Sequence, residues 1–418
     1  MSEASLTQAA NLPSGGGLSP TAPQERVVLL DVLRGFAIFG ILLFNMSFFS
    51  APLYLQMAGM EWGSGTGDRA TELLIRFFIQ GKFYSLFSFL FGLGFAVQML
   101  RAEAKGVRFG PLYRRRLLAL LLIGLVHAYL IWMGDILTIY ALLGFLLFLF
   151  RSRKPKTLLV WAVILLLVPV LLTAGMVAGQ ASFGSPEDFA ILVQNSMKAY
   201  SEGSFSEIMA QRAGDAFFVT IGGLFGGPGI FAMFLLGAYF GRQQLFQDTA
   251  SRLLLFRRIW LWGLGLGLVG NLIFTISMEY ADPTSPSIWM LVGMLGFAFG
   301  APGLCFFYIS SFVLLWQNTT WQRRLSPLAA VGRMALSNYL FQSIVCTTIF
   351  YSYGLGLYGQ VGPALGVGLA VVIYAIQIPL SRWWLGRFKF GPAEWVWRSL
   401  TYGQFQPMRV RKAVALEA

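Results

Sequence analysis

The sequence contains few charged residues, and this excludes most classes of soluble protein. Only 12% of its 418 residues are Asp, Glu, Lys or Arg, whereas soluble domains carry about 25%. Hydrophobic residues make up 56% of the chain, and the mean hydropathy is +0.66. These values predict a polytopic membrane protein with the lipid bilayer as its main partner.

Histidine and cysteine are almost absent, which removes most metal and disulfide chemistry. The chain has one histidine, His127, and two cysteines, Cys305 and Cys346, which lie in separate apolar runs. We therefore expect no metal site and no disulfide, and interpret the cysteines as small core residues. Phosphate-loop and nucleophile-elbow motifs are also missing, so no bound cofactor is predicted.

The formal net charge of +13 does not indicate a nucleic-acid-binding protein. Its 31 Lys and Arg residues fall in short blocks between long apolar runs. Blocks of this kind determine membrane topology. We expect no nucleic-acid partner, and the sequence does not specify an oligomeric state.

Ten stretches are candidates for membrane-spanning helices, which need about 20 mostly apolar residues. They are 29–49, 80–100, 116–133, 135–150, 157–178, 217–240, 256–278, 288–316, 333–353 and 362–383. We predict an all-α fold with about ten transmembrane helices. With both termini cytoplasmic, the cytoplasmic segments and adjoining helix ends collect all but six of the 31 Lys and Arg residues, as the positive-inside rule requires.

Composition also divides the chain into segments. We predict a disordered leader at 1–25, a first transmembrane region at 26–240 with an outer loop at 179–216, a second transmembrane region at 241–405, and a basic cytoplasmic tail at 406–418. In the outer loop, Ser185 followed by Pro186 predicts the capped start of a short helix.

Three polar residues follow one stripe of the first span. Asp31, Arg34 and Asn45 share a helix face at about 100° per residue. Charges inside a bilayer usually face a partner, water or the protein interior. Asp31 and Arg34 are either a structural ion pair or part of a functional site, and Asn45 is either a site residue or a hydrogen bond between helices.

His127 and Asp135 belong to the stretch "HAYLIWMGDILTIYALLGF". The turn Met133-Gly134-Asp135 is tight enough to let the carboxylate fold back toward the imidazole. Asp135 is then either a partner of His127 or only the cap of the next helix. His127 is either a proton acceptor or a packing residue.

Other polar residues have similar alternatives. Lys82 either attracts an anionic group or extends its amine to the interface. Ser337, Asn338 and Gln342 are spaced to share one helical flank. The motifs "FGGPG" at 225 and "FGAPG" at 299 are either paired helix breaks, as in transporters, or sites of kinking and close packing.

Five ordered motifs resemble the YeiB-like family of bacterial inner-membrane proteins, a domain of unknown function. They are "LLDVLRGFAIFGILLFNM", "GKFYSLFSFLFGLGF", "GLVHAYLIWMGDILTIYALLG", "GRMALSNYLFQS" and "FKFGPAEWVWRSLTYG", and the resemblance covers about residues 26–405. It implies a multi-pass protein of the bacterial plasma membrane, and it includes the second transmembrane region.

The opening "LDVLRGFAIFGILLFNM" also looks like the first span of heparan-α-glucosaminide N-acetyltransferase-like membrane acyltransferases. This more distant resemblance implies that Asn45 matches an asparagine near their acyl-transfer site. Those enzymes carry an active histidine shortly afterwards, whereas residues 46–75 contain none. The base would therefore have to be His127, or the activity is absent.

The leading functional hypothesis is acyl transfer across the membrane, from acyl-CoA as a cytoplasmic co-substrate to a small-molecule or glycan acceptor. The catalytic residues would be His127 as base, Asn45 at the acyl carbonyl and Asp135 orienting the imidazole. The substrate-binding residues would be Lys82, Arg34, Asp31, Asn338 and Gln342. The alternative is a transporter or exporter of a small polar or lipid-linked solute.

Overall fold

The computed structural model describes residues 27–55, 57–63 and 65–410, and this part of the chain is all-α apart from one isolated bridge between Phe388 and Arg409. The predicted leader at 1–25 and residues 411–418 of the predicted tail lie outside the described residues. The first eight helices are α1 (Val28–Ser50), α2 (Thr66–Leu74), α3 (Lys82–Ala104), α4 (Phe109–Val126), α5 (Leu137–Leu149), α6 (Pro155–Ala178), α7 (Pro186–Ser201) and α8 (Phe205–Arg242). The remaining six are α9 (Leu253–Tyr280), α10 (Ile288–Leu315), α11 (Thr319–Arg333), α12 (Ala335–Phe350), α13 (Pro363–Leu385) and α14 (Pro392–Tyr402).

Every one of the ten predicted spans contains a helix, but fewer helices are long and apolar enough to cross a bilayer. Six helical segments of the described residues qualify: α1, the stretch Thr66–Ala104 that ends in α3, α6, α9, α10 and α13. The bent α8 makes seven if its two parts count as one span. Since α5 has 13 residues and α12 has 16, both are shorter than the about 20 that a span needs. The chain is thus a multi-pass membrane protein, while ten spans and cytoplasmic termini stay predictions.

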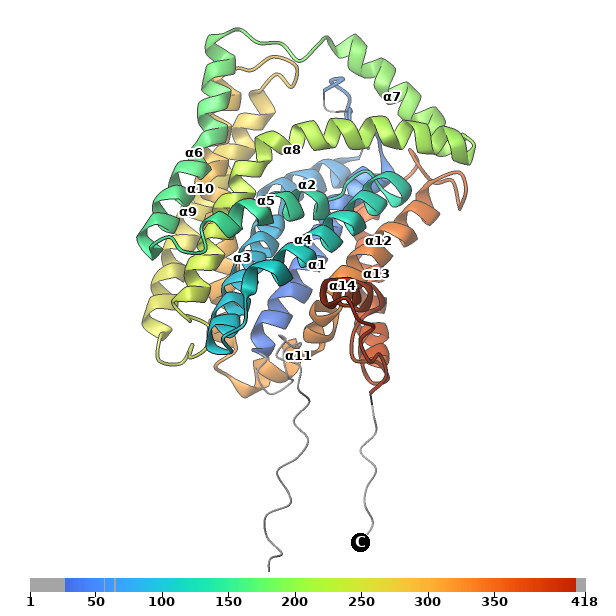
Figure 1. The fold of residues 1–418 in the computed structure, drawn as a ribbon. Coiled ribbons are helices and arrows are strands. Elements are labelled where there is room, and N and C mark those ends of the chain that lie inside the picture. Colours follow the sequence, from blue (N-terminus) through green and yellow to red (C-terminus); the bar gives the residue numbers. More distant parts are fainter. Residues whose placement is uncertain (1–26, 56, 64, 411–418) are drawn as a thin grey trace, which may run out of the picture.

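The helix α8 changes direction near its middle. Its parts Phe205–Gly223 and Phe225–Arg242 are inclined by 59°, and the first part crosses the top of the molecule beside α7 (Figure 1). The predicted outer loop at 179–216 is therefore largely helical. The predicted start of its first helix is confirmed, because Ser185 and Asp188 form a capping box at the N-terminus of α7.

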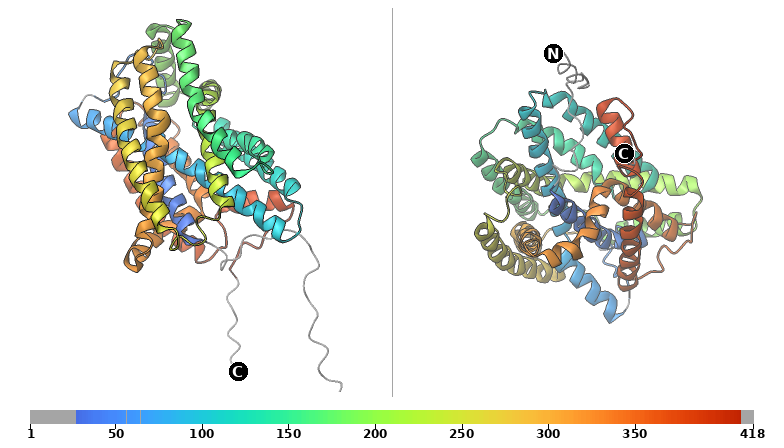
Figure 2. Two further views of the ribbon diagram at one scale, coloured as in Figure 1. Left: turned by 90° about the vertical axis from the view of Figure 1, so that its left-hand side faces the viewer. Right: turned by 90° about the horizontal axis from the view of Figure 1, so that it is seen from below.

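The helices α9 and α10 pack at very short range because glycines face each other. A Cβ atom at Gly270 would lie 2.6 Å from the carbonyl oxygen of Gly296, and one at Gly300 would lie 2.6 Å from the backbone nitrogen of Asn271. Figure 2 shows the two helices side by side, with α6 nearby. The second Gly/Pro motif lies in α10, which continues unbroken through Pro302, so that motif serves close packing.

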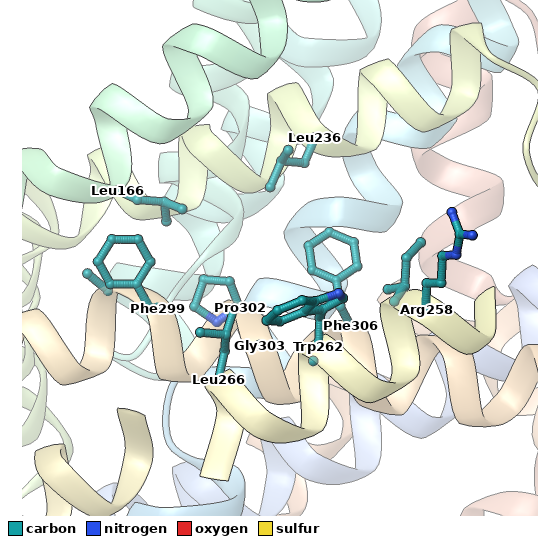
Figure 3. Close-up of a pocket in the computed structure, with 12 residues that line it drawn as sticks. Leu166, Leu236, Arg258, Trp262, Leu266, Phe299, Pro302, Gly303 and Phe306 are labelled. Atoms are coloured by element: carbon teal, nitrogen blue, oxygen red, sulfur yellow. The ribbon is translucent and has the colours of Figure 1, made fainter. Parts of the chain in front are cut away.

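An apolar groove of about 400 Å³ lies between these helices and α8 (Figure 3). Its walls include Leu166 of α6, Leu236 of α8, Trp262 of α9 and Phe299 of α10, with Arg258 at one end. None of the predicted site residues lines it. The predicted polar residues are instead carried by α1, α3, α12 and the connection between α4 and α5.

Candidate functional site

His127 is held at both ring nitrogens by side chains from two different parts of the fold. Its Nδ1 lies 2.9 Å from Oδ1 of Asp135, and its Nε2 lies 2.8 Å from Oγ of Ser343. His127 and Ser343 are fully buried, and the side chain of Asp135 is 2% exposed. With Asp135 ionised, Nδ1–H donates to the carboxylate, and Nε2 is then the acceptor for a hydrogen bond from the Ser343 hydroxyl. The other acceptor near this hydroxyl, the carbonyl oxygen of Tyr339, lies farther away at 3.4 Å.

The backbone around His127 departs from an ordinary helix. After α4 the chain continues as a π-helical turn, His127–Ile131, and then becomes extended at Trp132. π-Helical turns are rare, and those inside α-helices occur frequently at functional sites. His127 begins this turn, and its ring lies 6.3 Å from the ring of Trp132, which stacks on Phe49 of α1.

Asp135 both contacts His127 and caps α5. Its Oδ2 accepts a hydrogen bond from the backbone nitrogen of Thr138 at 2.7 Å, while Oδ1 faces the imidazole. Both alternatives considered for this residue are thus present together. The neighbouring Gly134 accepts a hydrogen bond from Oη of Tyr339, which ties the turn to α12 at 2.9 Å.

Ser343 comes from the middle of α12 and is the last residue of the motif "GRMALSNYLFQS", but no sequence pattern predicted a role for it. Its neighbour on the helix, Tyr339, places a ring 4.9 Å from that of His127. The spacing of Ser337, Asn338 and Gln342 does define a flank, but Asn338 and Gln342 face α13. No local pattern connects positions 127 and 343, which are 216 residues apart.

The start of α12 is fixed by Glu394 of α14. One carboxylate oxygen accepts from the backbone nitrogens of Leu336 and Ser337, and the other from the Ser337 hydroxyl. Burial raises the pKa of Glu394, and the hydrogen bonds from Ser337 and Leu336 act in the opposite direction. This buried carboxylate therefore positions the helix that carries Ser343.

The other predicted site residues have protein partners away from the imidazole. Asn338 donates to Val331 and Ser381 and so connects α12 to α11 and to α13. Gln342 donates to Gln377 at 2.8 Å and connects α12 to α13. Asp31 and Arg34 form an ion pair within α1, with 2.6 Å between Oδ1 and Nη1. At this position α1 packs closely against α11, because a Cβ at Gly332 of α11 would lie 1.8 Å from the carbonyl oxygen of Asp31.

Lys82 and Asn45 do not contact His127 either. Lys82 is fully buried and does not extend to the interface. Its Nζ donates at 2.9 Å to the carbonyl oxygen of Arg76, which belongs to the π-helical turn Ile75–Ile79. Asn45 is half-buried in α1. The roles proposed for these residues in substrate binding and at the acyl carbonyl stay predictions.

The arrangement Ser343–His127–Asp135 is able to move a proton from a hydroxyl to an imidazole that a carboxylate orients. That chemistry generates an oxygen nucleophile. Within the described residues, no three His, Cys, Asp or Glu side chains gather as a metal site. The hydroxyl, imidazole and carboxylate of Ser343, His127 and Asp135 offer acid–base and nucleophilic chemistry.

Comparisons with known proteins identify relatives along nearly the whole chain. Residues 240–404 match the family described as "Protein of unknown function (DUF418)". The uncharacterized protein YxaH of Bacillus subtilis is 44% identical over 419 residues, which cover 95% of this chain and 99% of YxaH. The uncharacterized protein YeiB of Escherichia coli is 32% identical over 387 residues, which cover 90% of this chain and 96% of YeiB.

Proposed function

The chain belongs to the YeiB-like family, and we propose that it transfers an acyl group across the membrane with His127 as the general base. The observation that carries the proposal is the buried line of hydroxyl, imidazole and carboxylate formed by Ser343, His127 and Asp135. The same constellation performs acyl transfer on unrelated folds, where it is recognised by geometry and not by sequence position.

In the first step, Ser343 takes the acyl group from an acyl-CoA thioester. The Ser343 oxygen attacks the thioester carbonyl while Nε2 of His127 accepts the hydroxyl proton. The carbon–sulfur bond breaks, and the imidazolium returns the proton to the departing thiolate, which leaves as coenzyme A. The products are an ester on Ser343 and the free thiol, and His127 is neutral again.

In the second step, an acceptor hydroxyl takes the place of the thiol. His127 removes its proton, the acceptor oxygen attacks the Ser343 ester, and the proton passes to the Ser343 oxygen as that bond breaks. Asp135 stabilises the imidazolium in both steps. Ser343 lies near the middle of α12.

Acetyl-CoA is a suitable probe for the first step. The purified full-length protein is mixed with acetyl-CoA, and coenzyme A is separated and measured together with the intact mass of the protein. We expect a burst of about one coenzyme A per chain and an acetyl adduct on Ser343. His127→Ala should slow the burst by about 10²–10⁴-fold, and Ser343→Ala should abolish the adduct.

Ser310 provides the matched control for the loss of a buried serine. It is fully buried in α10, away from His127, and its hydroxyl has no partner among the described residues. Ser310→Ala should keep the burst. An adduct that persists in Ser343→Ala would exclude Ser343 as the carrier, and an unchanged burst in His127→Ala would exclude the base.

Transport remains the second candidate, and the bend in α8 near Pro228 is the observation that favours it. The other Gly/Pro motif lies in an unbroken helix, so the paired breaks typical of transporters are not present. Protein in liposomes distinguishes the two functions. Movement of solute without release of coenzyme A would select transport over acyl transfer.

A further inference from the structure

A buried arginine on the first part of α8 lacks the partners that such a group requires. Arg212 is 1% exposed, and its Nη1 donates to the carbonyl oxygen of Leu130 at 2.7 Å. The same Nη1 also lies 3.3 Å from the sulfur of Met209. Its Nε and Nη2 are buried and have no hydrogen-bond partner among the described residues.

The two unpartnered nitrogens form one edge of the guanidinium group. The Nε–H and Nη2–H bonds are parallel, and this edge binds both oxygens of a carboxylate or phosphate. The contact with Leu130 orients the plane through Nη1 and leaves the edge free. Buried charges in proteins are nearly always paired, so this edge has the geometry of an oxyanion site.

The nearest acidic side chain does not occupy that edge. Asp215 follows Arg212 by three positions and is also 1% exposed. Its oxygens accept hydrogen bonds from Tyr54 at 2.8 Å, from Tyr200 at 2.7 Å and from Gln211 at 2.9 Å. Three neutral donors therefore satisfy Asp215, and its negative charge offsets part of the positive charge of Arg212 without a direct hydrogen bond.

The ring of Tyr351 lies beside Arg212. The Cζ atom of Arg212 is over this ring at 5.7 Å from its centroid, a cation–π arrangement, and the Tyr351 hydroxyl is a second buried donor without a partner among the described residues. Tyr351 directly follows α12, and its ring is 5.9 Å from that of Tyr353, which is 44% exposed. The aromatic side chains beside Arg212 thus extend to the surface at Tyr353.

We propose that Arg212 and Tyr351 bind the oxyanion of a ligand, a carboxylate or a phosphate group. The Nε and Nη2 of Arg212 hold two of its oxygens. The site is close to the imidazole in the fold, because Leu130 belongs to the π-helical turn that His127 begins. The inference goes beyond acyl transfer and does not depend on it.

The test is the thermal stability of the purified full-length protein in acetate, inorganic phosphate or chloride at constant ionic strength. A ligand that binds only the folded state raises Tm with its concentration. We expect Tm to rise saturably with acetate or phosphate compared with chloride. The anion that raises Tm shows whether the site binds a carboxylate or a phosphate group. Arg212→Lys keeps the charge but removes the two parallel N–H donors, so the Tm of this variant should no longer rise with the anion. Tyr351→Phe should require a several-fold higher anion concentration for the same rise in Tm.

Arg242 is the matched control, because it also lies on α8 and donates to backbone carbonyls, those of Phe150, Arg151 and Arg153. Arg242→Gln should lower Tm but keep the response to anions. An equal response in Arg212→Lys and the unsubstituted protein, or no response to either anion, would overturn the proposal. Because this readout uses no acyl-CoA, its failure is distinct from a missing coenzyme A burst.

Discussion

The α9–α10 side of the molecule and the α12–α13 side differ in what joins their helices. Between α9 and α10, glycines bring the backbones into contact and no side-chain ladder is needed. Between α12 and α13, Asn338, Gln342, Gln377 and Ser381 form a buried ladder of hydrogen bonds. The first side faces outward with apolar residues such as Trp262, which is 72% exposed.

This difference shows where the chain concentrates its polar chemistry. Hydrocarbon solvates polar groups poorly, so those groups gather where other helices supply partners. His127, Asp135 and Ser343 all lie on the α12 side. Substitutions there should change activity, whereas substitutions between α9 and α10 should change stability alone.

The largest effect is expected from Asp135→Asn. The amide oxygen is able to keep the cap of α5, but the NH2 group would face Nδ1 of His127. The imidazole would then carry its proton on Nε2 and could not accept one from Ser343. The coenzyme A burst should slow by about 10²–10⁴-fold while Tm changes little. An unchanged burst would show that the carboxylate does not orient the base.

The second-largest effect is expected from widening the glycine contact between α9 and α10. A Cβ at Gly270 would lie 2.6 Å from the Gly296 oxygen and 2.7 Å from the Gly300 Cα atom. Gly270→Val must therefore separate the helices, at a cost of about 1–3 kcal/mol. Tm should fall and the burst should persist in the folded fraction.

Gly265 of the same helix provides the control, since a Cβ there would meet nothing within 4 Å. Gly265→Val should leave Tm nearly unchanged. If Gly270→Val were as stable as Gly265→Val, close backbone contact would not be what holds this side together.

A smaller effect is expected where α14 meets α12. Glu394→Ala leaves the backbone nitrogens of Leu336 and Ser337 without their acceptor, which should cost about 1–3 kcal/mol. Glu394→Gln keeps one oxygen for both nitrogens and should cost less. Equal Tm values for the two variants would mean that water replaces the carboxylate at no cost.

The smallest effect is a dependence on pH. Burial raises the pKa of Glu394 above its ordinary value of 4.5, so the folded state binds this proton more tightly than the unfolded state does. The resulting stability is fully present below the unfolded pKa and is lost as pH rises through the folded pKa. As pH rises above 4.5, the Tm of the unsubstituted protein should therefore fall relative to the Tm of the Glu394→Gln variant. A Tm difference that is constant with pH would contradict this.

Apolar runs were sufficient to predict ten helical stretches, because hydrophobic content and Gly/Pro boundaries are local properties. They did not predict the polar α11, and they do not decide which helices span the bilayer. The short α5 and α12 show the limit of this reasoning, because an apolar run fixes neither the length of a helix nor its position relative to lipid. The direction of α8 on either side of its bend is likewise set by packing.

The candidate site was predictable only where its contacts are local. The short turn before Asp135 allowed the carboxylate to fold back toward His127 as one of two alternatives, and the structure contains this contact together with the cap of α5. Ser343, Tyr351 and the unpartnered edge of Arg212 depend on contacts between distant segments. The burial of Arg212 beneath other elements leaves no mark on its neighbours in the sequence.

The distance along the chain between His127 and Ser343 also has a consequence for biosynthesis. A ribosome delivers α4 and α5 to the membrane long before α12, since 216 residues separate the two partners. The pairing of His127 with Asp135 requires only the hairpin of α4 and α5. The contact of Nε2 with Ser343 forms only after α12 has been translated, near the end of the chain. Nascent chains released before that point would hold an oriented imidazole with no serine to activate.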